Sequence, residues 1–390
     1  MNPLPPMAEV KSFFPGTRKD VLETLILLVH CMIRGRTVCL YKCRTEAGSV
    51  LNRQNLNLDS VYKRFVRFYC KGSVDVICVG IAWLLIHLTK TQEAVFLVMD
   101  RTNWKIGQVN INVLFIGLLL PGGVFVPVLW LPLNKKGNSS TAERLVLMNR
   151  FLHVWQHLGS SPVTVLADRE FIGLEWFVRL RTSNFSLVIR ARWQDYLPLV
   201  AQSLDKTIYK TSRLIERKVK ANGLFQASFA VDGYTFYYTA QFNTGSRKGK
   251  DKWLILISDE KDIATINAAY RKRWGIEVFF LHCKTNGMNL EDLNLKAPQK
   301  LQLMMGVVAI AYCLSIAEGL RIDKVKPCKI KKSKNGHFRA ISIFRQGFDS
   351  LKNRLHLLWE LKLWLVKCLR NTKKIVLKKP TLDFLTQSVQ

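Results

Sequence analysis

Hydrophobic and polar positions divide the chain into a helical beginning, a strand-rich middle and a helical end. Val21–Ile33 has the pattern of an apolar helix, and Ser60–Tyr69 mixes aromatic residues with cations at helical spacing. Residues 1–90 are therefore predicted to form a helical domain. Val76–Leu88 within it is apolar but too short to span a membrane.

Short apolar runs then predict strands. The run Glu93–Met99 ends in Asp100, and two longer runs, Gln108–Leu120 and Val124–Leu133, follow it. The sequence Pro-Gly-Gly separates these two runs. It is typical of a turn, so we expect a buried β-hairpin here and not a membrane span.

A helix and a further strand follow the hairpin. Ser140 and Glu143 have the spacing of a capping box, which predicts a helix that begins there and continues to about Leu158. Pro162–Ala167 is another apolar run, and Asp168 follows it directly. The predicted order is three strands, a helix and a strand, with an acid at the end of the first and last strands.

The later segments complete the domain prediction. Residues 91–184 form the first part of an α/β core, and residues 185–257, with three β-rich runs, form an insertion. A helix from about Asp262 to Lys284 lies in the second part of the core, residues 258–320. Residues 321–390 are predicted to be a basic helical region.

The net charge of the chain indicates which kind of molecule it binds. The chain has 59 Lys and Arg against 28 Asp and Glu, a formal net charge of +31 and a pI near 10.0. This excess is too large for an ordinary metabolic enzyme and indicates a polyanion, with nucleic acid the first candidate and an anionic membrane surface the second. The basic segment Ser60–Tyr69 fits a helix that contacts a nucleic-acid backbone, or equally an amphipathic helix with a solvated basic face.

Cysteine usage favours a reduced compartment. The nine cysteines are odd in number, and no pair has CxxC spacing. The group His30, Cys31, Cys39 and Cys43 matches no standard zinc finger, so small buried cysteines are the better interpretation. The first residues lack the apolar segment of a secretory signal.

Three acids stand where metal-dependent phosphoryl transfer would need them. Two Mg²⁺ ions require about three carboxylates from separate elements that meet at one edge of a sheet. Asp100 and Asp168 each follow an apolar strand, and Glu277 lies on the predicted helix. At about 100° per residue, Glu277 shares an arc of about 60° with Tyr270, Arg273 and Lys284. The alternatives are a cap or turn aspartate and a surface Arg–Glu pair.

These residues resemble a known family. The sequences VMDRTNWKIG around Asp100 and VLADREFIG around Asp168 are similar to those of DDE transposases of bacterial insertion sequences. The spacing Tyr-x2-Arg-x3-Glu-x6-Lys, from Tyr270 to Lys284, resembles the Tyr-Arg-Glu-Lys signature of the insertion sequence four group. KTNGMNLED after the helix is also similar. The resemblance covers about residues 93–295.

The resemblance implies a ribonuclease H-like catalytic core with a β-rich insertion, and a DNA-end-binding role for residues 1–90. It implies that Asp100, Asp168 and Glu277 bind two Mg²⁺ ions, for which Mn²⁺ would substitute. Water then attacks at the terminal inverted repeats, and the freed 3′-OH attacks target DNA. The implied DNA contacts are Tyr270, Arg273, Lys284, Arg101 and Trp104.

The resemblance also implies a homodimer on DNA and a cytoplasmic, nucleoid-associated bacterial protein without a membrane. Two alternatives remain open: a nuclease of the same fold without strand transfer, and a non-catalytic transposase-derived DNA-binding protein. Glu291 and Asp292, two turns beyond the signature, are rival candidates for the third acid.

Overall fold

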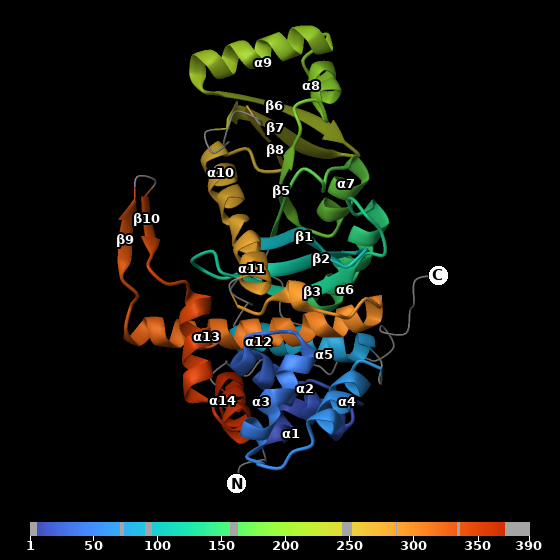
Figure 1. The fold of residues 1–390 in the computed structure, drawn as a ribbon. Helices are drawn as coiled ribbons and strands as arrows, with labels where there is room; N and C mark the ends of the chain where they lie inside the picture. Colours follow the sequence, from blue (N-terminus) through green and yellow to red (C-terminus); the bar gives the residue numbers. More distant parts are fainter. Residues whose placement is uncertain are drawn as a thin grey trace.

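The computed structural model describes residues 6–70, 74–89, 96–156, 163–243, 252–285, 287–333 and 336–370. The fold is mixed α/β, with one large, mostly antiparallel sheet at its centre (Figure 1). Its strands are β1 (Phe96–Ile106), β2 (Val109–Leu119), β3 (Phe125–Pro132), β4 (Thr164–Ala167), β5 (Ser186–Ala191), β6 (Leu224–Val231), β7 (Tyr234–Phe242) and β8 (Trp253–Ser258). A separate two-stranded hairpin comprises β9 (Ile330–Ser333) and β10 (Gly336–Arg339).

Helices surround the sheet on both faces and form a bundle at one end of it. Those before and between the strands are α1 (Pro6–Lys11), α2 (Lys19–Gly35), α3 (Leu40–Leu51), α4 (Leu58–Phe68), α5 (Val74–Thr89), α6 (Thr141–Gln156), α7 (Leu174–Thr182), α8 (Leu197–Ser203) and α9 (Ile208–Asn222). Those after β8 are α10 (Ile263–Lys272), α11 (Trp274–Lys284), α12 (Pro298–Val325), α13 (Ile343–Arg354) and α14 (Leu358–Arg370), with a 3₁₀ turn at Leu290–Asp292.

The sheet has the strand order β3-β2-β1-β4-β5-β8-β7-β6. The central strands β1, β4 and β5 run parallel, and Met99 is the partner of Ala167 where β4 ends. The predicted hairpin is confirmed, since β2 and β3 pair antiparallel around the Pro-Gly-Gly turn. Gly122 and Gly123 have φ of +88° and +79°, values that residues with a Cβ rarely adopt.

One strand boundary differs from the prediction. We expected the first strand to end before Asp100, but β1 continues to Ile106 because β2 supplies backbone partners along its whole length. The parallel neighbour β4 ends beside Met99, just before the position of Asp100. The capping box before α6 is confirmed: the Ser140 amide donates to Glu143 Oε2 at 2.6 Å, and the Glu143 amide donates to Ser140 Oγ at 3.3 Å.

The strands from the predicted insertion join the same sheet. β5 lies in the central parallel group, and β8, β7 and β6 extend the sheet from it by antiparallel pairing. Between β5 and β6 the chain forms α8 and α9, which lie at the far end of the molecule from the N-terminal helices (Figure 1).

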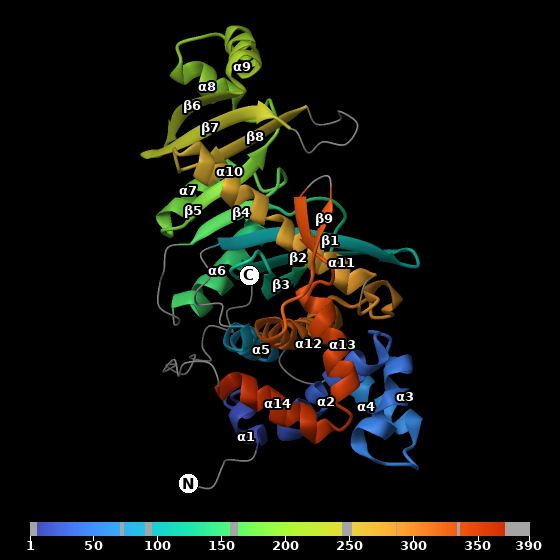
Figure 2. The ribbon, with the colours of Figure 1, turned by 90° about the vertical axis from the view of Figure 1, so that its left-hand side faces the viewer.

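Alternate residues of the strands face two separate cores. Val98 joins the core shared with the N-terminal helices and α11–α13, whereas Leu97 and Met99 join the core under α6, α7 and α9. The view in Figure 2 shows helices on either side of the sheet. This two-sided burial explains why the strands have long apolar runs with little alternation.

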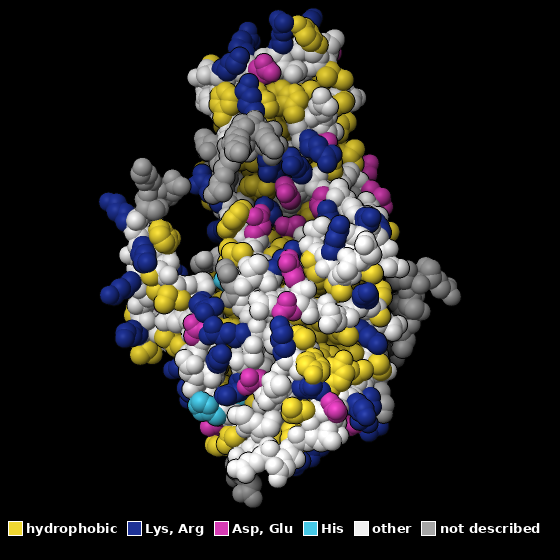
Figure 3. All heavy atoms as spheres, in the orientation of Figure 1, with side chains coloured by type: hydrophobic (Ala, Val, Ile, Leu, Met, Phe, Trp, Pro, Cys, Tyr) yellow, Lys and Arg dark blue, Asp and Glu magenta, His cyan; other side chains and the backbone are white. Residues whose placement is uncertain are grey.

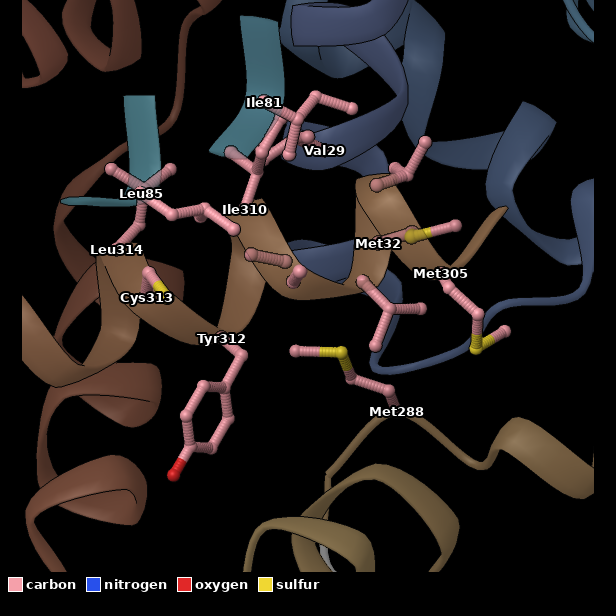
Figure 4. Close-up of a cluster of buried hydrophobic side chains, with 14 of the residues drawn as sticks. Val29, Met32, Ile81, Leu85, Met288, Met305, Ile310, Tyr312, Cys313 and Leu314 are labelled. Atoms are coloured by element: carbon pink, nitrogen blue, oxygen red, sulfur yellow. The ribbon is translucent and has the colours of Figure 1, made fainter. Parts of the chain in front are cut away.

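α12 is the central helix of the first core. Its side chains meet those of α2 and α5, and Met288 approaches it from the segment after α11 (Figure 4). Among the described helices it alone is long and apolar enough to cross a membrane, but 89% of its apolar window is buried in the protein. Helices α2 and α3 pass the same test only as a joined pair, and they are bent by 100°.

A buried glutamate ties the last helices together. Glu318 of α12 is fully buried and accepts hydrogen bonds from Ser350 of α13 at 2.8 Å and from the Trp364 indole of α14 at 3.0 Å. Arg321 and Arg354 form ion pairs with the same carboxylate. The basic segment 371–390 lies outside the described residues. All nine cysteines are free thiols.

Candidate active site

Two of the predicted acids lie side by side in the sheet. Since Met99 is the partner of Ala167 on parallel strands, Asp100 and Asp168 occupy the next position on each. Adjacent strands are about 4.8 Å apart. Each carboxylate accepts a 2.8 Å hydrogen bond from the following backbone amide, of Arg101 and Arg169 respectively, which fixes its orientation. Parallel pairing therefore brings together two acids that are 68 positions apart in the chain.

The third acid reaches this place through an arginine. α10 ends at Lys272 and α11 begins at Trp274, and Arg273 at the junction keeps helical dihedral angles. Its Nη1 lies 3.0 Å from Asp100 Oδ2, and its Nη2 forms an ion pair with Glu277, one turn further along. Arg273 is 8% exposed and stands between the two carboxylates.

The charges at this site are strongly coupled. Burial raises the pKa of Asp100 to about 7, against the lowering effect of Arg273, and Asp168 and Glu170 raise it further. The pKa of Arg273 is raised although burial opposes its charge, because Tyr270 and the surrounding carboxylates stabilise the cation. At Asp100, burial and the two neighbouring acids therefore outweigh Arg273, so a further cation bound beside Asp100 would stabilise its charged form.

The other two signature residues also face this region. The Tyr270 ring lies 5.7 Å from the Arg273 guanidinium, and its buried hydroxyl has no hydrogen-bond partner among the described residues. Burial raises the pKa of Tyr270. Lys284 donates a 2.8 Å hydrogen bond to the carbonyl of Asn103 on β1, so the far end of the stripe contacts the strand that carries Asp100.

Arg101 and Trp104, the two other predicted DNA contacts on β1, are engaged or buried within the protein. Arg101 donates to Glu170 at 2.7 Å and to Asn138 at 3.0 Å. Trp104 is 6% exposed, and its indole Nε1 is buried without a hydrogen-bond partner among the described residues. Their predicted contact with DNA stays a prediction, and the burial of Trp104 argues against direct stacking on a base.

Two arginines that the sequence analysis did not single out also shape the site. Arg144 of α6 is buried and donates to the carbonyl of Ile172 at 3.0 Å and to that of Glu170, so it holds the loop after Asp168. Arg190 on β5 has its Nη1 4.0 Å from Asp168 Oδ1. A cation inside the otherwise apolar run LVIRA was a signal for Arg190, whereas nothing local marked Arg144.

A glycine contact sets the position of α11. A Cβ at Gly275 would lie 2.4 Å from the carbonyl oxygen of Gly123 and 2.9 Å from Leu119 Cδ2. The first turn of α11 therefore packs directly on the backbone of the β2–β3 turn. This contact fixes the helix that carries Glu277 against the strands that carry the aspartates.

A cavity of about 580 Å³ lies on the other side of α11. Its lining combines the aromatic residues Tyr312 and Phe344 with the cations Arg271 and Arg339, and Trp274 stands at it with 62% of its surface exposed. His282 also lines it, and the His282 ring stacks on Phe344 with centroids 4.5 Å apart.

The donor atoms fit a divalent metal, but their present arrangement does not enclose one. Within the described ranges, no three His, Cys, Asp or Glu side chains are placed so that they could share a metal ion. Carboxylate oxygens are the ligands that Mg²⁺ prefers. Arg273 lies where the acids would otherwise converge, so a shared ion requires it to release at least one carboxylate.

Comparison with known proteins agrees with this chemistry. Residues 122–314, just under half of the chain, match the transposase DDE domain family. The match contains Asp168 and the whole helix with Glu277, and it begins after Asp100. A search of curated proteins finds none that matches the chain. The family match supports a function in DNA transposition, with DNA as the substrate.

Proposed function

We propose that this protein is a DNA transposase that cleaves at the ends of an insertion sequence and transfers the freed 3′-OH into target DNA. One observation supports this most directly: Asp100 and Asp168 occupy adjacent register positions, and Arg273 links Glu277 to the same site. The family match and the net charge of +31 point to the same substrate.

The finer assignments belong to the same proposal. The order β3-β2-β1-β4-β5, with β2 antiparallel to both neighbours, supports a ribonuclease H-like core. The Tyr-Arg-Glu-Lys spacing supports the insertion sequence four group. The protein would act as a homodimer on two DNA ends, with residues 1–90 binding the terminal inverted repeats, in the bacterial cytoplasm.

Each residue has a distinct task in this reaction. Asp100, Asp168 and Glu277 would hold two Mg²⁺ ions, which when bound activate the attacking oxygen and stabilise the leaving one. Arg273 is placed to neutralise the carboxylates before DNA and metal arrive, and to contact a phosphate once released from them. Tyr270 and Lys284 orient the DNA strand along β1.

The test is cleavage of DNA that carries the sequences flanking the gene, with Mg²⁺, with Mn²⁺ and with EDTA. Asp100→Asn, Asp168→Asn and Glu277→Gln are expected to abolish metal-dependent cleavage while DNA binding in a gel-shift assay persists. Glu291→Gln is the matched control, because Glu291 is exposed and lies outside the cluster. Nicking that survived unchanged in Asp168→Asn would refute the assignment.

Strand transfer needs a second measurement. A pre-cleaved end with a labelled 3′-OH is incubated with supercoiled plasmid and Mg²⁺, and joined products are resolved on a gel. Joined products are expected from a transposase. Cleavage without joining would identify a nuclease of the same fold, and binding without cleavage a non-catalytic DNA-binding protein.

A further inference from the structure

Helix α9 stands apart from the site, at the far end of the sheet from the N-terminal helices (Figure 1). It packs on β6 and β7 through three side chains that are fully buried, Thr211, Ile215 and Val219. Their spacing of four residues makes a narrow stripe along one side of the helix. Ser212, Leu214 and Glu216 beside this stripe are half-buried, and the other residues of α9 are exposed.

The opposite side of α9 is a row of cations. At about 100° per residue, its members lie within an arc of about 80°, centred about 180° from the buried stripe. These residues, which we call the α9 cationic row, are Lys210, Arg213, Arg217 and Lys220. All four are exposed. Figure 3 shows Lys and Arg side chains gathered over this end of the molecule.

The described residues form no ion pair with this row. Within these ranges the Arg213 guanidinium lies 4.8 Å from the centroid of the Tyr209 ring. The first helical turn has no acid and contains Lys210, the reverse of what the helix dipole favours. Lys210 therefore does not serve the stability of the helix, whereas Lys220 in the last turn suits the dipole.

We propose that the α9 cationic row binds the phosphate backbone of duplex DNA, at a surface separate from the three acids. From Lys210 to Lys220 the row is about 15 Å long, the axial length of four to five base pairs. A membrane surface does not fit, because the apolar side of α9 is buried in the protein. The DNA role rests on the proposed function, since transposition must hold duplex on both sides of the cleaved bond.

The experiment measures equilibrium binding of the full chain to a fluorescein-labelled 40-base-pair duplex of arbitrary sequence at several NaCl concentrations. The variant with all four cations of the row changed to alanine is expected to bind more weakly. Its plot of log K against log salt is expected to be less steep by about three to four, since each lost phosphate contact removes about 0.9 from the slope. A wild-type slope in this variant would overturn the proposal.

A single pair of substitutions gives the matched control. Lys218 is exposed and lies on the same helix, about 160° around the axis from Lys220. Lys220→Ala is expected to reduce the slope by about one, and Lys218→Ala to leave it unchanged. Equal effects would show a general charge effect and sink the proposal.

The same variants separate this proposal from the proposed function. Metal-dependent cleavage is measured in parallel with binding. If the row alters the salt slope but no metal-dependent cleavage occurs, the transposase proposal fails and the DNA surface stands. If cleavage persists and the salt slope of the four-alanine variant is unchanged, the DNA surface fails and the transposase proposal stands.

Discussion

Substitution of Gly275 by alanine tests whether the β2–β3 turn positions the catalytic helix. The added Cβ would lie 2.4 Å from the Gly123 carbonyl oxygen, and such contacts are essentially never shorter than 3.0 Å. The helix and the turn must therefore separate by at least about 0.6 Å. Overpacking of this kind costs about 1–3 kcal/mol, and alanine in a helix returns at most about 1 kcal/mol. A net loss of about 1 kcal/mol, or roughly 2 °C in Tm, is expected.

Activity should fall much more than stability does. Glu277 lies two residues beyond the substitution, and a displacement of about 1 Å at a reacting centre can lower the rate about 100-fold. Thermal unfolding and metal-dependent DNA cleavage are measured on the same preparation. Gly35→Ala is the control, since its nearest neighbours lie at 3.5 Å and it should be neutral. Wild-type Tm and wild-type cleavage in Gly275→Ala would refute the reasoning.

Three further predictions concern polar side chains. His30 is fully buried, donates a 3.0 Å hydrogen bond from Nε2 to the carbonyl of Leu355, and has a pKa that burial lowers to about 4. As the pH falls, the unfolded chain therefore takes up a proton on this residue before the folded protein does. Urea unfolding should give a free energy of unfolding that His30 leaves constant above pH 6.5 and lowers towards pH 4, by up to about 3 kcal/mol. In His30→Gln the free energy of unfolding should fall less steeply over this pH range. Glu318→Ala should lower the free energy of unfolding by about 1–3 kcal/mol, because it leaves the buried Trp364 indole N–H without an acceptor. Asp20→Ala at an exposed ion pair should change it by less than about 1 kcal/mol, and similar losses in the two would contradict the buried network. Lys284→Met should weaken DNA binding or strand transfer without altering the Mg²⁺ dependence of cleavage, and an altered Mg²⁺ dependence would place Lys284 among the metal ligands.

The sequence predicted those turns, helices and strands that a few adjacent residues determine. The Pro-Gly-Gly turn, the capping box at Ser140 and the apolar runs before Asp100 and Asp168 each depend on a few adjacent residues, and the structure has the corresponding turn, helix and strands. The stripe from Tyr270 to Lys284 follows from helical periodicity in the same way, because Arg273 keeps helical dihedral angles at the α10–α11 junction.

Features that depend on distant partners were not predicted. No local signal says that β8, β7 and β6 pair onward from β5, since any apolar strand offers the same backbone groups. The position of Arg273 between two carboxylates depends on a side-chain rotamer and on the approach of α11 to β1. The close contact of Gly275 with Gly123 needs the tertiary fold as well, because a glycine at a helix start has many possible reasons.

The unbroken pairing from β4 to β6 has a consequence for how DNA would lie on the protein. Four strand spacings separate β4, which leads to Asp168, from β6, on which α9 packs, a span of roughly 19 Å. Hydrogen-bonded strands do not slide apart as two domains on a flexible linker would. The sheet thus works as a spacer of fixed length between β4 and the strand under α9, so the two places keep one separation whatever DNA sequence is bound.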